Sequence, residues 1–72
     1  MTLQEIKDKV CENIGRDVTI RYNLGRNKFE KYNVKIKETY KNVFIVEVVD
    51  KKYEIKSFSY TDVMTKTIKI DY

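Results

Sequence analysis

Positive side chains are gathered in the middle of the chain. Eight lysines and arginines lie between residues 16 and 41, with only three acidic residues among them, so this segment carries +5 while the remainder sums to −1. A local excess of this kind indicates an electropositive face rather than general solubilising charge. Such a face can bind phosphates, unstacked bases or an acidic protein surface.

The hairpin predicted around residues 22–28 is the strongest candidate for a binding surface, because Tyr22, Phe29 and Tyr32 are interleaved with its cations. Arginines and lysines beside aromatic rings suit both nucleic acid and protein partners. Two more tyrosines, Tyr40 and Tyr60, fall in predicted turns, where a hydroxyl can also form a hydrogen bond to an otherwise unpaired backbone group. The candidate binding residues are Arg21, Asn23, Arg26, Lys28, Lys31, Tyr40 and Tyr60. The alternative is that the strand positions are ordinary outward-facing ones, with Tyr22 and Tyr32 pointing into the core.

Residues that could perform catalysis are nearly missing. The chain has no histidine, the residue that most easily moves protons near neutral pH and most often binds metals. Cys11 is followed by Glu12, whose charge would raise rather than lower the pKa of a thiol nucleophile. Asp8 and Glu12 are four residues apart on a predicted helix, which is typical of a solvated face, and Gly15 and Gly25 form no phosphate-binding loop. The sequence therefore predicts no enzymatic activity, no metal and no cofactor.

Seventy-two residues predict a single domain, residues 1–72, too small for a deep catalytic cleft. No apolar run approaches the ~20 residues that span a bilayer, so no membrane interaction is expected. The N-terminal residues lack the features of a signal peptide. With a lone Cys11 in addition, the chain is expected to be cytoplasmic, with a reduced thiol.

An amphipathic helix is predicted over residues 3–14. Thr2 and Glu5 match a capping box at its start, and Gly15 ends it. Its apolar residues recur at spacings of three and four and share one face: Leu3, Ile6, Val10 and Ile14. Polar residues are expected mostly on the other face: Lys7, Asp8, Glu12 and Asn13.

Beyond residue 17 the hydrophobic period changes to two, which predicts strands. The predicted strands span residues 18–23, 29–37, 43–49, 53–58 and 66–72. Strand 43–49 is nearly all apolar, as expected if both of its faces are covered. Polar turns are predicted at residues 24–27 and 50–52, and a compact turn at 58–65 would let the sheet bend sharply.

This order of elements predicts a mainly β fold: a small five-stranded antiparallel SH3-like or Sm-like barrel, about residues 17–72, with an N-terminal α-helix covering one open end. A split two-layer α+β sandwich is the alternative architecture.

The chain resembles the Veg family of short proteins from Gram-positive, mostly spore-forming bacteria. The matching segments are LQEIK (3–7), GR (15–16), NLGRNK (23–28), ETY (38–40), VFIV (43–46) and SFSYTDVMTKTI (57–68). The last segment is the most specific. Two residues depart from the family's pattern: Asn27 stands where a second basic residue is usual, and Lys41 where Pro is usual. A glycine common in the second strand is also absent near residues 33–35.

The resemblance implies a cytoplasmic, non-enzymatic regulator of gene expression that stimulates biofilm formation by opposing a repressor of matrix genes, with a link to spore outgrowth. The leading hypothesis is binding to a protein partner, a transcriptional regulator, through the basic hairpin. Direct binding of DNA or RNA by the same face is the second hypothesis. A structural homodimer formed through an exposed strand is the third.

Overall fold

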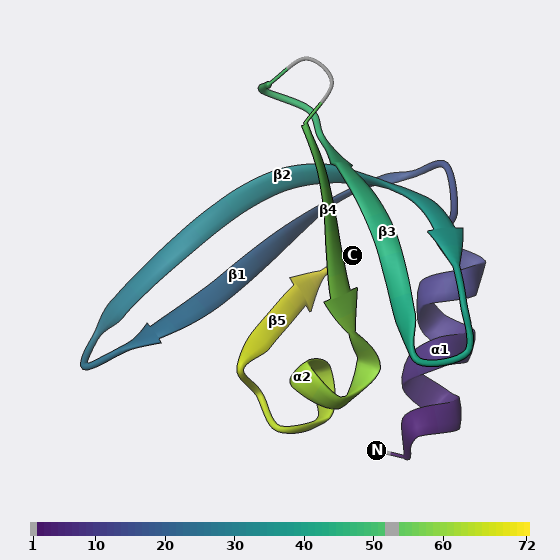
Figure 1. Cartoon of the computed structure of the whole chain (residues 1–72), viewed down its shortest axis with the longest axis horizontal. Helices are drawn as coiled ribbons and strands as arrows, with labels where there is room; N and C mark the ends of the chain where they lie inside the picture. The colour runs from purple at the N-terminus through teal and green to yellow at the C-terminus, as the bar shows by residue number, and fades with distance from the viewer. Residues whose placement is uncertain (1, 52–53) are drawn as a thin grey trace.

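Five antiparallel strands form one strongly bent sheet, with the strand order β4-β3-β2-β1-β5 (Figure 1). The computed structural model describes residues 2–51 and 54–72. Its elements are α1 (Leu3–Glu12), β1 (Asp17–Gly25), β2 (Lys28–Thr39), β3 (Val43–Val48), β4 (Ile55–Ser59), α2 (Tyr60–Met64) and β5 (Ile68–Asp71). The predicted mainly β fold, with five antiparallel strands and an N-terminal helix, is confirmed.

The sheet bends without closing into a complete barrel. Within residues 2–51 and 54–72, no strand pairing joins the two edge strands, β4 and β5. Register shifts at Asn23/Gly25 in β1 and Ile36/Glu38 in β2 are bulges, which increase local bend and twist. The predicted compact turn at 58–65 contains the short helix α2, which connects the two edges. Ser59 caps α2, its Oγ accepting a hydrogen bond from the Asp62 amide at 3.1 Å.

Helix α1 begins with the predicted capping box. The Glu5 amide donates to Thr2 Oγ1 at 3.1 Å, and the Thr2 amide donates to Glu5 Oε1 at 3.2 Å. These hydrogen bonds to Thr2 lower the pKa of the Glu5 carboxyl below its ordinary value. The helix ends at Glu12, two residues earlier than predicted, and Gly15 follows with φ +85°.

The buried face of α1 differs from the predicted face. Ile6 and Val10 are buried, but Leu3 and Ile14 are each 45% exposed, and Ile14 lies beyond the end of the helix at Glu12. Lys7 is half-buried where α1 meets α2. The predicted polar residue Asn13 is also buried, since its Nδ2 donates to the Lys9 carbonyl at 2.8 Å.

The core lies on the concave side of the sheet. Its buried residues are Ile6, Val10, Val18, Ile20, Val34, Ile36, Phe44, Val46, Val48, Phe58, Tyr60 and Ile68. At its centre the Phe44 ring lies 6.0 Å from that of Phe58 and 5.4 Å from that of Tyr60, between ring centroids. The expectation that both faces of 43–49 are covered is only partly met. Alternate residues of β3 are half-buried and Val49 is 51% exposed, because an antiparallel sheet turns one face to solvent.

Three predicted strands are shorter in the structure, and the third of the sheet ends at Val48 instead of Val49. The fourth begins at Ile55, while Lys52 of the predicted turn and Tyr53 of the predicted strand lie outside the described residues. The fifth begins at Ile68, because Lys66 has a left-handed backbone (φ +64°) that a strand cannot contain.

The turn between β1 and β2 needs backbone conformations that glycine tolerates best. Strand pairing extends to Gly25 and Lys28, so the loop is only Arg26 and Asn27, and Gly25, Arg26 and Asn27 all have positive φ. Two-residue hairpin loops with positive φ match the twist of the flanking strands.

Replacing Gly25 with alanine is expected to lower the free energy of unfolding by about 1–2 kcal/mol, the usual cost of a left-handed conformation for a residue with a Cβ. Nothing lies within 4 Å of the added Cβ at this position, so the loss comes from the backbone alone. Urea unfolding followed by circular dichroism measures it. Asn27→Gly is the control and should change stability by less than about 0.5 kcal/mol. Equal losses in both variants would contradict this interpretation.

Candidate binding face

Three cations lie side by side across the outer, solvent-facing side of the sheet. Arg21 of β1 is paired with Lys31 of β2 on one side and with Lys69 of β5 on the other. Directly paired residues of neighbouring strands point to the same face, with Cβ atoms about 5 Å apart. The outer row Lys31–Arg21–Lys69, together with the exposed turn residues Arg26 and Lys28, is called the basic hairpin face below. Like charges in paired positions destabilise a sheet.

The outer rows beyond these cations carry carboxylates: Asp71, paired with Thr19, lies in the adjacent row, and Asp17 and Glu47 lie in the row after that. Lys35 is paired with Asp17 on β1 and with Glu47 on β3, so its charge is flanked by two carboxylates. Lys37 also forms an ion pair with Glu47 at 3.5 Å. In the basic hairpin face, Arg21 forms one ion pair, with Asp71 at 3.0 Å. The unbalanced positive charge of this side is therefore concentrated on one row and does not extend across the sheet.

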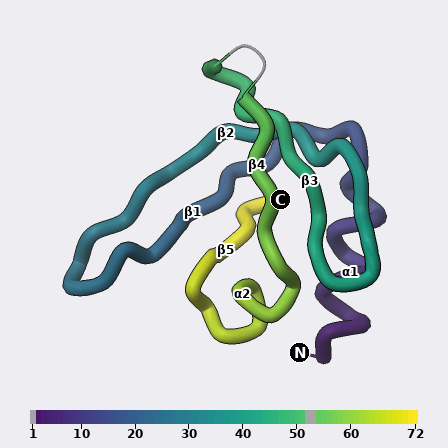
Figure 2. The backbone as a smooth tube through the Cα atoms, viewed as in Figure 1, coloured from purple at the N-terminus to yellow at the C-terminus, as the bar shows by residue number. Residues whose placement is uncertain are grey.

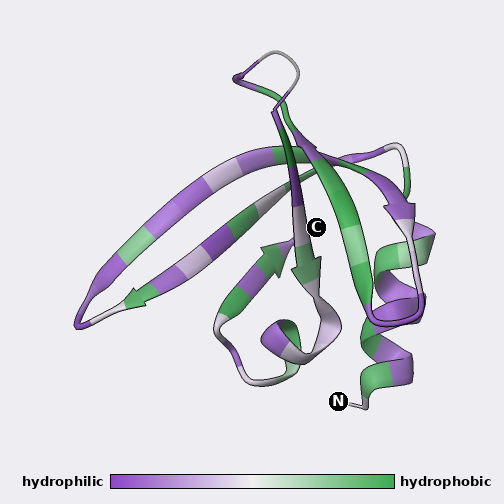
Figure 3. Ribbon diagram, in the orientation of Figure 1, coloured by the Kyte–Doolittle hydropathy of each residue, from purple (hydrophilic) through white to green (hydrophobic). Residues whose placement is uncertain are grey.

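The β1–β2 hairpin projects away from the remainder of the chain (Figures 1 and 2). Its outer half is largely hydrophilic in Figure 3. Two large apolar side chains are nevertheless exposed there, Leu24 at 51% and Phe29 at 60%. Phe29 is paired with Asn23 and therefore lies on the outer side, next to the row of cations. The Asn23 side chain has a structural contact, its Oδ1 accepting a hydrogen bond from the Gly25 amide at 2.8 Å.

The structure brings together five of the seven predicted site residues. Arg21, Asn23 and Lys31 lie on the outer side, and Arg26 and Lys28 lie at the turn. Of the interleaved aromatic residues, Tyr22 and Tyr32 are half-buried against the core, as the alternative interpretation expected. Sequence reasoning missed Lys69. The alternation of residues 66–70 places it opposite to Ile68 and Ile70, but nothing in the sequence shows that β5 lies beside β1.

Tyr40 and Tyr60 lie away from the basic hairpin face. Tyr40 follows β2 and is 52% exposed; its hydroxyl donates to the Glu38 carboxylate, which raises the pKa of Tyr40. Tyr60 begins α2 and is 3% exposed, and its buried hydroxyl has no hydrogen-bond partner within the described residues. The Tyr40 hydroxyl bonds a side chain and not a backbone group, so the predicted role is wrong for Tyr40. The Tyr60 hydroxyl lies near the Tyr40 backbone, as predicted, but without the geometry of a full hydrogen bond.

Burial raises the pKa of the Tyr60 hydroxyl above its ordinary value of 10.0, and the Cys11 thiol acts in the same direction. The Thr39 hydroxyl and the Tyr40 backbone act in the opposite direction and lower this pKa. Neither group forms a hydrogen bond of normal geometry with the Tyr60 hydroxyl. Cys11 is half-buried and donates its S–H to Thr39 Oγ1 at 3.4 Å.

The raised pKa of Tyr60 predicts loss of stability in alkali. The folded protein holds this proton more tightly than the unfolded chain, so the contribution to stability is complete below a pH of about 10 and falls as the pH rises through the folded-state pKa. Glu30 raises the pKa of Tyr32, and Glu38 that of Tyr40, with the same sign. Urea unfolding at a series of alkaline pH values tests this, with Tyr60→Phe as control. The decline should be shallower in the variant, and identical declines would contradict the assignment to Tyr60.

The row of cations on the outer side of the sheet offers a surface for binding a macromolecule. Within residues 2–51 and 54–72, no three cysteine, aspartate or glutamate side chains gather into a candidate metal site. No helix in this part of the chain is long and apolar enough to cross a membrane. A solvent-facing row of cations beside an exposed aromatic ring presents charge and apolar surface to a macromolecule.

The strand order, the bent sheet and the short helix before the last strand define a small, mainly β protein, with an N-terminal helix and a row of cations on the outer side of its sheet. The chain belongs to the VEG family: the family model described as "Biofilm formation stimulator VEG" matches residues 1–71. The resemblance found in the sequence is thereby confirmed. Membership gives the chain a regulatory role in biofilm formation. A comparison with curated proteins finds no matching relative.

Proposed function

We propose that this protein is a cytoplasmic, non-enzymatic regulator that stimulates biofilm formation by binding an acidic surface of a transcriptional regulator through the basic hairpin face. The observation that supports this most strongly is the row Lys31–Arg21–Lys69, where the sheet holds three positive charges next to one another. Repulsion within the row costs stability, and a negatively charged partner would relieve it. A link to spore outgrowth belongs to the same proposal and rests on family membership.

The surroundings of the row favour a protein partner over nucleic acid. Phe29 adds exposed apolar surface beside the cations, and an aromatic residue next to arginine is typical of the centre of a protein interface. Direct contact with duplex DNA is therefore the weaker hypothesis.

Capture of partners from native cytosol, with and without nuclease treatment, tests the proposal. A DNA-binding regulator should be retained equally in both samples. Binding of the purified protein to duplex DNA should be undetectable even at low salt. If DNA binding is instead measurable, and its affinity falls with salt at a log–log slope of about −0.9 per phosphate contact, nucleic acid is the ligand of this face.

The homodimer hypothesis has its own test. The outer edge of β4 pairs with no other strand among the described residues and carries Ile55, which is 56% exposed. Sedimentation should nevertheless give the monomer mass of 8.7 kDa at micromolar concentration. Twice that mass, lost on Ile55→Lys, would support the structural dimer instead.

A further inference from the structure

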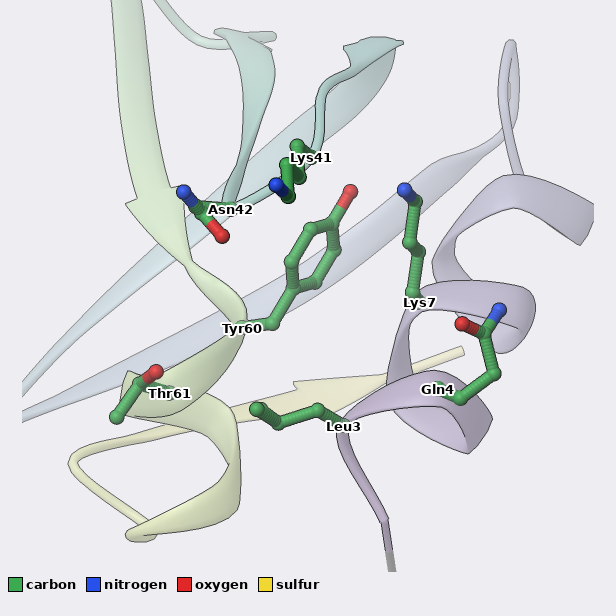
Figure 4. Close-up of a pocket in the computed structure, with 7 residues that line it drawn as sticks. All are labelled: Leu3, Gln4, Lys7, Lys41, Asn42, Tyr60 and Thr61. Atoms are coloured by element: carbon green, nitrogen blue, oxygen red, sulfur yellow. The ribbon is translucent and has the colours of Figure 1, made fainter.

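A second polar site lies at the end of the molecule away from the hairpin tip. A pocket of about 350 Å³ opens between α1, the β2–β3 turn and the start of α2 (Figure 4). The residues that line it are Leu3, Gln4, Lys7, Lys41, Asn42, Tyr60 and Thr61. A backbone hydrogen bond from the Tyr60 amide to the Asn42 carbonyl, 3.2 Å long, holds α2 against the turn. None of the lining residues is acidic, although two of them carry positive charge.

The two lysines of this pocket have no carboxylate partner. Neither Lys7 nor Lys41 forms an ion pair within residues 2–51 and 54–72. Lys7 is also half-buried, so part of its side chain packs against the wall of the pocket. Asp8 is the nearby acid on the same helix, and it accepts a hydrogen bond from Gln4 Nε2 at 2.8 Å. The pocket therefore keeps a net positive charge.

The Tyr60 hydroxyl is the second indication of a ligand. Tyr60 is 3% exposed, and its hydroxyl oxygen is the buried polar side-chain atom that lacks any hydrogen-bond partner in the described part of the chain. Burying a hydroxyl without a hydrogen-bond partner lowers the stability of the folded protein. A bound ligand that accepts a hydrogen bond from this hydroxyl would restore that stability. In Figure 4 this hydroxyl is drawn between the ammonium groups of Lys7 and Lys41. The hydroxyl oxygen is itself buried, with Cys11, Thr39 and the Tyr40 backbone nearby, so the lysine side chains would have to turn aside for a ligand oxygen to reach it.

We propose that this pocket binds the phosphate monoester group of a small soluble ligand. The Lys7 and Lys41 ammonium groups pair with the phosphate, and the Tyr60 hydroxyl donates to one of its oxygens. A phosphate monoester carries a charge of about −1.5 to −2 and three acceptor oxygens, which matches two cations and several donors. A carboxylate has one charge and two oxygens, so it would leave the pocket positive. The site is separate from the basic hairpin face and is independent of the function proposed for that face.

Titration of the isotope-labelled protein with glycerol phosphate, inorganic phosphate and acetate, followed by amide NMR shifts, tests the proposal. Both phosphates should cause saturable shifts centred on residues 3–7, 41–42 and 60–61, whereas acetate should bind at least about tenfold more weakly. Lys7→Ala and Lys41→Ala should each weaken phosphate binding about tenfold, as expected for loss of a charged hydrogen bond. Tyr60→Phe should weaken it about fivefold without lowering Tm, because the free protein loses only an unpaired hydroxyl.

Lys28→Ala, at the hairpin turn, is the matched control and should leave phosphate affinity unchanged. Shifts that do not saturate, shifts centred on Arg21 and Lys31, or unchanged affinity in Lys41→Ala would each overturn the proposal. Binding to phosphatidic acid vesicles with none to glycerol phosphate would overturn it too, because the ligand would then be a lipid headgroup. The lysine variants keep the test decisive if Tyr60→Phe does not fold.

Discussion

Replacing Phe44 with alanine is expected to lower the free energy of unfolding by about 3–5 kcal/mol, the usual loss when a buried aromatic side chain is removed. Phe44 is fully buried and packs against the rings of Phe58 and Tyr60 at the centre of the core. A domain of this length has a total stability of only about 4–11 kcal/mol. The variant should therefore lose a large share of its total stability, which urea unfolding at 25 °C measures.

Phe29→Ala provides the matched control, because it makes the same substitution at a site where the ring is 60% exposed. Its stability should change by less than about 0.5 kcal/mol. A loss below about 1 kcal/mol in Phe44→Ala, or similar losses in both variants, would show that the core is not organised around Phe44.

The double substitution Lys31→Glu/Lys69→Glu is expected to weaken partner binding by at least about 30-fold, because several charge pairs across the interface become repulsive. The free energy of unfolding of the free protein should rise. Arg21 would gain a carboxylate on each neighbouring strand in place of two like charges, and each opposite-charge pair contributes about 0.2–1 kcal/mol. The measurements are affinity for the captured regulator and urea unfolding of the free variant.

Lys41→Glu is the control for this double variant, because it reverses a charge in the β2–β3 turn, outside the basic hairpin face. It should retain partner binding. Loss of binding in both variants would point to net charge as the cause. A double variant that loses several kcal/mol of stability would show that the row serves the fold instead.

The alternation of apolar residues was sufficient to predict the core of the sheet. Val18 and Ile20 in β1, and Val34 and Ile36 in β2, are all buried, because a period of two places alternate residues on one face whatever the neighbouring strands are. The helix was harder to predict. Lys7 was expected on the solvent-facing side of the helix but is half-buried. The burial of a helix residue depends on which other elements contact the helix, here α2 and β2, and the helical pattern alone does not give these.

The candidate site could be predicted only where it is local in sequence. Arg21 and Lys31 belong to one hairpin, whose turn fixes their pairing. Lys69 joins them through the long-range pairing of β5 with β1, which no local pattern encodes. The same limit hid the pocket between α1 and α2, because Lys7, Lys41 and Tyr60 come from three segments that only the folded chain brings together.

Amide NMR mapping of the labelled protein, as the captured regulator is added, tests the proposed recognition mode most directly. The largest shifts should fall on β1, β2 and β5 around Arg21, Lys31 and Lys69, and on the turn at residues 24–28. The shifts should be absent when the regulator is added to Lys31→Glu/Lys69→Glu. Shifts confined to the edge of β4 or to the α1–α2 pocket, with the hairpin unaffected, would contradict binding through the basic hairpin face.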